Sequence, residues 1–96
     1  AEPQFLPGAR PMSIVLSAVP GFQELMEVQR TLSSLAATAG ASVVAFKNGE
    51  ASLEVALHGA LTAREIIDGL GGTIGQHLLI EEARPDELRL RLRFVD

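Results

Sequence analysis

Apolar and polar residues alternate on both sides of Asn48-Gly49, in the segment 42–57. Asn-Gly between two alternating runs is the strongest short-range signal for a β-hairpin, because both central residues of a type I′ turn need positive φ. Counting outward from this turn pairs each residue with one on the other strand. The expected pairs are Lys47 with Glu50, Phe46 with Ala51, Ala45 with Ser52, Val44 with Leu53, and Val43 with Glu54.

This register predicts one dry face and one mostly polar face, since side chains alternate along a strand. The dry face would carry Val44, Phe46, Ala51, Leu53, Val55 and Leu57. The other face would carry Val43, Ala45, Lys47, Glu50, Ser52, Glu54 and His58. A slip of one residue would mix the two sets, so the pattern and the turn agree.

Two segments have apolar residues at helical spacing. In 22–39 these are Phe22, Leu25, Val28, Leu32, Leu35 and Ala39, and Gly40 fits a C-terminal stop. A second helix would begin at Thr62-Ala63-Arg64-Glu65, which has the spacing of a capping box, and end at Gly71-Gly72.

Three further segments read as strands. The short apolar run 13–19, ended by Val19-Pro20-Gly21, predicts a central buried strand. Segments 77–83 and 88–95 flank Pro85-Asp86 and predict a second hairpin. A three-residue loop would pair Ile80 with Leu92, Leu78 with Phe94 and Glu81 with Arg91, although it lacks the Gly that such loops prefer.

The order strand, helix, strand, strand, helix, strand, with a final strand appended, predicts an α+β domain of the ferredoxin-like split βαβ type. Two right-handed crossovers would place both helices on one face of an antiparallel sheet and leave the other face open or covered by a partner. The 96 residues suffice for one domain, over 12–96. Residues 1–11 are rich in Pro, lack periodicity and read as a flexible linker or processed end.

Five sequence features between Val19 and Gly72 occur in the same order as in a known family. They are Gly21-Phe22, the helix through Leu32 and Leu35, the strand Gly-Ala-Ser-Val-Val-Ala-Phe, the Asn-Gly turn, and the helix start Thr-Ala-Arg-Glu-Ile-Ile. This segment resembles the heavy-metal-associated domain family, a ferredoxin-like fold that carries soft metal ions on two cysteines. The family has Gly-Met where this chain has Gly21-Phe22. The resemblance covers a little over half the chain and implies the fold more than an activity.

The cysteine positions of that family are occupied here by Glu24 and Glu27. Copper(I) needs thiolate or thioether ligands, so the resemblance does not extend to soft-metal binding. Two glutamates at this spacing read as a solvated helix surface rather than a site for a hard cation. We expect no metal site and no cofactor.

Composition narrows the function further. The chain has no Cys, which removes disulfides, thiolate metal sites and a thiol nucleophile. No apolar run is long enough for a membrane span. The Arg-rich, Lys-poor composition resembles that of a protein from a high-GC bacterial genome. A cytoplasmic location is favoured, and export after signal cleavage is the alternative, because the first residue is Ala1.

The loop Pro20-Gly21-Phe22 precedes a helix N-terminus, where free N–H groups favour anions, so it is a candidate site for an anion or amino acid. Plain turn chemistry is the competing reading, because every strand-to-helix connection has such a loop.

Arg89, Arg91 and Arg93 would stand in a row on the last strand and could meet phosphates or an acidic partner. A solvated edge strand is the competing reading. Nucleic acid is not favoured, because the net charge is −4 and the chain has four Phe but no Tyr or Trp for base stacking.

No set of residues has the pattern of a catalytic site, and we expect no enzyme. The leading hypothesis is a protein-interaction, oligomerisation or regulatory module of a larger protein. It would use an exposed sheet edge, or the open sheet face with Val43 and Ala45. A small-ligand sensor at the Pro20-Gly21 loop is the alternative, and nucleic-acid binding through the last strand comes third.

Overall fold

The computed structural model describes residues 4–8, 10–74 and 77–95. Residues 1–3 and 9 of the expected linker, and residues 75, 76 and 96 of the expected domain, lie outside the described residues. The elements are β1 (Gln4–Phe5), β2 (Met12–Ser17), α1 (Phe22–Ser34), β3 (Thr38–Lys47), β4 (Glu50–Leu57), β5 (Leu61–Thr62), α2 (Ala63–Ile74), β6 (His77–Arg84), a 3₁₀ turn (Pro85–Glu87) and β7 (Arg89–Val95).

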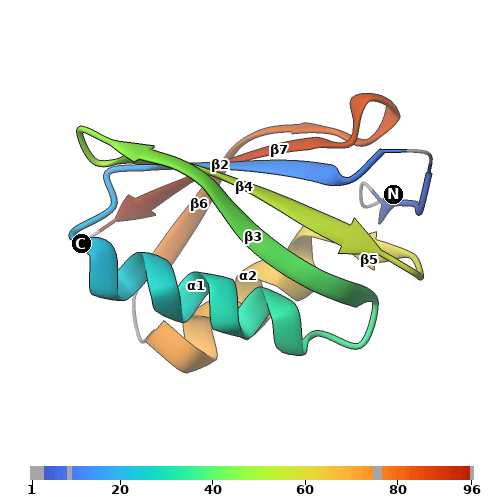
Figure 1. Ribbon diagram of the computed structural model, residues 1–96, viewed down its shortest axis with the longest axis horizontal. Helices are drawn as coiled ribbons and strands as arrows, with labels where there is room; N and C mark the ends of the chain where they lie inside the picture. The colour runs from blue at the N-terminus through green and yellow to red at the C-terminus, as the bar shows by residue number, and fades with distance from the viewer. Residues whose placement is uncertain (1–3, 9, 75–76, 96) are drawn as a thin grey trace.

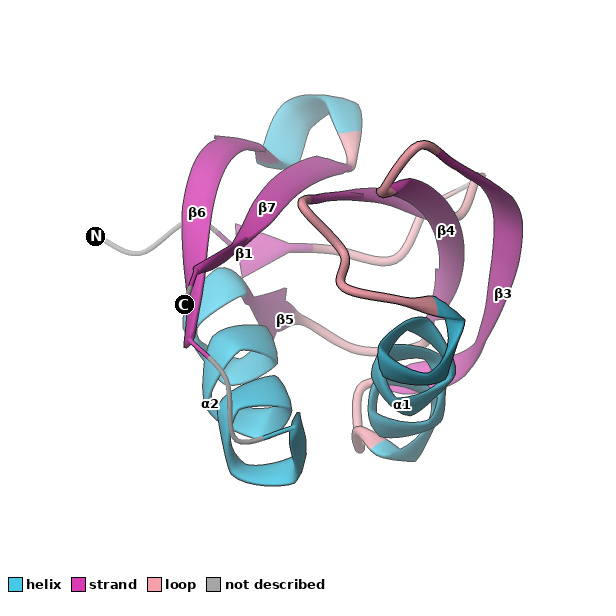
Figure 2. Ribbon diagram, turned by 90° about the vertical axis from the view of Figure 1, so that its left-hand side faces the viewer, coloured by secondary structure: helices cyan, strands magenta, loops and turns pink. Residues whose placement is uncertain are grey.

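The fold is an α+β arrangement of two layers. Five strands form one sheet in the order β3-β4-β2-β7-β6, and both helices lie against the same face of it (Figure 1; Figure 2). Helix α1 packs on β3, helix α2 packs on β6, and the two helices touch each other. The expectation of two helices on one face of a sheet is therefore confirmed.

The last strand, β7, does not extend the sheet at one of its edges, as an appended strand would. It is inserted between β2 and β6, parallel to β2 and antiparallel to β6, so the sheet is mixed rather than purely antiparallel. Strand β2 is central, as predicted, and its buried residues alternate with half-buried ones. It ends at Ser17, before the expected end at Val19, because Ala18 takes a positive φ of 58°. The edges of the sheet are β3 and β6.

Part of the N-terminal segment packs on the domain. Strand β1 pairs with β5, and the Phe5 side chain is fully buried in the core. The interior between sheet and helices is otherwise built from the inward positions of β2, β4 and β7 and from one face of each helix. Its largest fully buried side chains include Ile14, Leu16, Leu25, Leu32, Leu53, Ile66, Leu70, Leu90 and Leu92.

The first hairpin has the expected turn, with Asn48 at φ 54° and Gly49 at φ 76°. Lys47 pairs with Glu50, Phe46 with Ala51 and Ala45 with Ser52, as the sequence predicted.

Beyond these pairs the predicted register of β3 is wrong, because a β-bulge lies between Val43 and Ala45. Val43 therefore stands opposite Leu53 and packs against the core, while Val44 is 58% exposed. The bulge shifts β3 by one residue, so the expected burial of the two valines is exchanged.

The second hairpin is closed by a four-residue loop. Leu88 takes the left-handed conformation at φ 52°, where such loops prefer Gly. Ile80 pairs with Leu92 and Leu78 with Phe94, as predicted, but Arg91 faces Glu82 rather than Glu81 because β6 has a bulge at this point. The loop is one residue longer than predicted, and the bulge adds one residue to β6. The two differences cancel, so the pairs beyond the bulge, from Ile80 with Leu92 onward, have the predicted register.

Helix α2 begins with the Thr62 half of the expected capping box, since the Glu65 backbone N–H donates to the Thr62 hydroxyl oxygen at 3.1 Å. The Glu65 carboxylate accepts from that hydroxyl, with Oε1 at 3.2 Å. The helix continues past the expected stop at Gly71-Gly72, to Ile74.

Helix α1 ends earlier than Gly40, since Leu35 is already extended and Gly40 lies within β3. The Thr38 hydroxyl lies 2.5 Å from the Leu32 carbonyl oxygen and 2.9 Å from that of Leu35. The hydroxyl thus donates to carbonyl oxygens at the end of α1, which have no hydrogen-bond partner inside the helix.

Two buried threonines differ in whether their hydroxyl groups have hydrogen-bond partners. We therefore expect Thr→Val to change the free energy of unfolding in opposite directions at the two positions. The Thr31 hydroxyl is buried with no hydrogen-bond partner in the described part of the chain. Thr31→Val should raise the free energy of unfolding by about 1 kcal/mol, because it removes a desolvated polar group. Thr38→Val should lower it by about 1 kcal/mol, because the bonds to Leu32 and Leu35 are lost.

Urea denaturation, monitored by circular dichroism, measures the free energy of unfolding of both variants. Each is the control for the other, since the change in volume and in β-branching is the same. Destabilisation by Thr31→Val would show that its hydroxyl has a partner in solution.

Candidate interaction surfaces

The face of the sheet opposite the helices carries three parallel rows of side chains. Arg89, Arg91 and Arg93 on β7 form a basic row, and all three are exposed. Ser13, Val15 and Ser17 on β2 form a central row of small side chains, because the parallel register sets them beside the three arginines. Glu50, Ser52 and Glu54 on β4 form the third row. We call this surface the open face.

The rows are in step along the strands. Arg89 is level with Ser13, and Ser13 is level with Glu54. Arg91 is level with Val15 and Val15 with Ser52. The same register, continued by one residue, brings Arg93 and Ser17 level with Glu50. A basic row and an acidic row thus flank a low central row.

The charges of the open face are only partly paired. Arg91 Nη2 lies 4.0 Å from Glu50 Oε2, across β2. Arg89, Arg93 and Glu54 have no ion-pair partner within 4.0 Å among the described residues.

Arg84 is different, because its charge is shared with its own hairpin. It lies 3.3 Å from a carboxylate oxygen of Glu82 and 3.3 Å from one of Glu87. The hydrogen bond and the charge of Glu82, followed by those of Glu87, raise the pKa of Arg84 above its usual value. The free positive charge of this face is therefore concentrated on β7.

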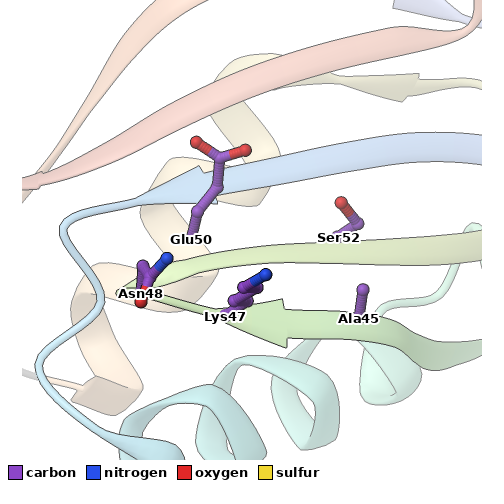
Figure 3. Close-up of a pocket in the computed structure, with 5 residues that line it drawn as sticks. All are labelled: Ala45, Lys47, Asn48, Glu50 and Ser52. Atoms are coloured by element: carbon purple, nitrogen blue, oxygen red, sulfur yellow. The ribbon is translucent and has the colours of Figure 1, made fainter.

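Ala45 stands on the open face as predicted, near the tip of the first hairpin. Figure 3 shows its side chain on the same side of the sheet as those of Lys47, Glu50 and Ser52. With Asn48 they line a shallow hollow. Val43, the other residue expected on this face, packs against the core instead, because of the bulge.

A second surface lies at the edge formed by β3 and the start of α1. Phe22, Met26, Val44 and Phe46 are all exposed, at 59%, 39%, 58% and 36%. The rings of Phe22 and Phe46 lie 6.2 Å apart between centroids. Met26 follows Phe22 by one helical turn, so it lies on the same side of α1. We call these four residues the β3-edge patch.

The sequence pattern missed this patch. Periodicity assigned Phe22, Val44 and Phe46 to the core, because it tells which face a residue lies on but not whether an element reaches the rim of the domain. The signal that could have exposed them is topological: β3 is an edge strand, and only one side of it is covered by a neighbouring strand.

The Pro20-Gly21-Phe22 loop is packed against the first hairpin. The Val19 backbone N–H donates to the Gly49 carbonyl oxygen at 2.8 Å, and Phe22 contacts Phe46. A Cβ on Gly21 would lie 3.4 Å from Glu24 Oε1. The negative charge that the start of α1 would attract is thus supplied by the chain's own carboxylate, which disfavours an anion at this loop.

Glu27, one of the two glutamates at the start of α1, lies 3.7 Å from Arg30 in an exposed ion pair. Across residues 4–8, 10–74 and 77–95, no three His, Cys, Asp or Glu side chains come together as metal ligands would. Within the same residues, no helix is long and apolar enough to cross a membrane.

None of the three comparisons with known proteins identifies a relative: no family model, no curated protein and no solved structure matches this chain.

Proposed function

We propose that this domain is a non-enzymatic protein-interaction module that binds an apolar segment of another protein at the β3-edge patch. The observation that carries the proposal is the exposure of two neighbouring aromatic rings, Phe22 and Phe46, at a free sheet edge. Met26, one helical turn after Phe22, and Val44, two residues before Phe46, are exposed as well. Aromatic and Met side chains are enriched at protein interfaces, where a few anchor residues supply most of the binding energy.

The edge itself argues for a partner that docks by its side chains. The bulge at Val44 interrupts the outer hydrogen-bonding edge of β3, and Lys47 adds a charge near its end. Both features oppose the pairing of one sheet edge with another. An apolar segment seated over Phe22 and Phe46 would bury the rings without needing a regular ladder.

The scaffold fits such a role. We infer that it is a variant of the ferredoxin-like split βαβ arrangement, supported by the order β3-β4-β2 and by both helices on one face. In this variant β7 occupies the place beside β2 that the fourth strand would otherwise take. The likeness to the heavy-metal-associated family would then lie in this shared scaffold and not in ligand chemistry.

The test is a selection of displayed random peptides on the intact domain, followed by affinity measurement through fluorescence polarisation. We expect enrichment of peptides with two or more apolar side chains. Val44→Lys combined with Phe46→Lys should weaken their binding at least about tenfold, the loss of a little over 1 kcal/mol that one anchor side chain supplies.

The matched control is Leu79→Lys combined with Ile80→Lys, which places two lysines at exposed apolar positions of the opposite edge strand β6. This variant should bind like the unchanged domain. A selection with no enriched peptide, or equal losses in the two double variants, would rule the proposal out.

A further inference from the structure

The charges of the open face are self-complementary: a basic row on β7 and an acidic row on β4 lie at equal distances on either side of β2. Solubility alone does not require such an arrangement. From this arrangement we infer that a second copy of this chain binds the open face, sheet against sheet, around a two-fold axis parallel to β2. The inference concerns a different surface from the β3-edge patch, so either proposal can fail without the other.

The strand order selects this axis. A two-fold rotation about a line along β2, between the two sheets, leaves β2 over its own copy and carries β7 of one copy over β4 of the other. The basic row then faces the acidic row twice in each dimer. A two-fold axis perpendicular to the strands would instead place β7 over β7, which opposes arginine to arginine.

The same two-fold rotation leaves positions along the strand direction unchanged, so residues that are level within one copy face each other between the two copies. Arg89 is level with Glu54, so it meets Glu54 of the second copy. Arg93 is level with Glu50 and meets Glu50 of the second copy. Arg89, Arg93 and Glu54 are the charges of this face without an ion-pair partner among the described residues.

The centre of the face is shaped for close approach. Ser13, Val15 and Ser17 are half-buried and small, and Val15 would meet its own copy near the axis. Stacked sheets pack about 10 Å apart, with strands turned by about 30°, and long Arg and Glu side chains at the margins can span that gap.

The size of the face indicates a weak dimer. Four strand spacings of about 4.8 Å and strands about 20 Å long give a flat area on the order of 400 Å² per copy. Stable dimers usually bury about 800 Å² per partner, and transient ones bury less. We therefore expect self-association that rises with protein concentration and weakens as salt screens the charge pairs.

The test uses two charge-reversal variants of the whole chain, Arg89→Glu with Arg93→Glu, and Glu50→Arg with Glu54→Arg. Sedimentation velocity over a range of concentrations should show a monomer–dimer equilibrium for the unchanged chain. Each variant alone should remain monomeric, because its two rows now carry the same sign. An equimolar mixture should form heterodimers, because every reversed side chain then faces an opposite charge.

The matched controls are Arg30→Glu with Arg64→Glu, and Glu27→Arg with Asp68→Arg, which make the same changes in net charge on the helices. Both should dimerise like the unchanged chain, and circular dichroism should show all variants folded. A strict monomer at every concentration, unaltered dimers in the reversal variants, or a folded mixture that stays monomeric would each overturn the inference. Loss of the dimer through Val44→Lys and Phe46→Lys alone would assign it to the β3-edge patch instead.

Discussion

Leu53→Ala should destabilise the domain by about 2–5 kcal/mol, the range measured for large-to-small changes in protein cores. Leu53 is fully buried in β4, with Ile14 of β2 on one side and Val43 of β3 on the other. Both neighbours belong to strands fixed by hydrogen bonding, so the space left by the missing methyl groups cannot close easily. A domain of this size is typically stable by about 5–15 kcal/mol, and the loss is a large part of it.

Urea denaturation measures this loss, and the neighbouring valines supply its control. Val43→Ala should cost clearly more than Val44→Ala, because Val43 packs against the core while Val44 is 58% exposed on the bulge. The regular register expected from the sequence would reverse that order. A larger cost for Val44→Ala would therefore contradict the bulge, and a negligible cost for Leu53→Ala would contradict the packing around β4.

Gly49→Val should destabilise the domain by about 1–2 kcal/mol or more, because an L-residue pays roughly this amount in the left-handed conformation and β-branching adds to it. Gly49 has φ 76°, and its carbonyl oxygen accepts the bond from the Val19 N–H at 2.8 Å. A change at the turn therefore reaches the loop before α1. For a domain of this length, each kcal/mol lowers Tm by about 4–8 °C.

Differential scanning calorimetry measures the shift, with Gly40→Val as the matched control. Gly40 lies in β3 outside the positive-φ region, and a Cβ there would meet nothing within 4 Å. The control should leave Tm nearly unchanged or raise it. Equal shifts for the two variants would mean that the turn does not need its left-handed glycine.

Local chemistry made several features predictable. Asn48-Gly49 fixes the turn and the three pairs next to it because few other residues tolerate positive φ. Thr62 and Glu65 mark the start of α2 because the Thr62 hydroxyl accepts a hydrogen bond from the free N–H of Glu65, and the Glu65 carboxylate accepts one from that hydroxyl. These signals act over a few residues, and the sequence shows them directly.

Features that depend on distant partners were not predictable in the same way. The bulge at Val44 arises where β3 must bend along β4, and no residue in the sequence marks it. The left-handed Leu88 occupies a position that turn rules assign to Gly. The insertion of β7 beside β2 depends on a pairing between segments more than 70 residues apart.

The candidate sites follow the same division. The arginine row on β7 was readable from strict alternation, but its match with Glu50 and Glu54 appears only once β2 separates the two strands. The β3-edge patch was hidden because the pattern treats every inward position as covered.

The place of β7 also bears on the synthesis of the chain. Elements leave the ribosome in order, so β2, β3 and β4 can pair well before β7 exists, while one side of β2 stays bare. That bare side belongs to the strand carrying Ile14 and Leu16, which are fully buried in the finished domain. The nascent sheet thus passes through a stage with an unprotected inner strand. Rapid translation of segment 77–95 would shorten this stage, and a holdase chaperone would shield the strand while it lasts.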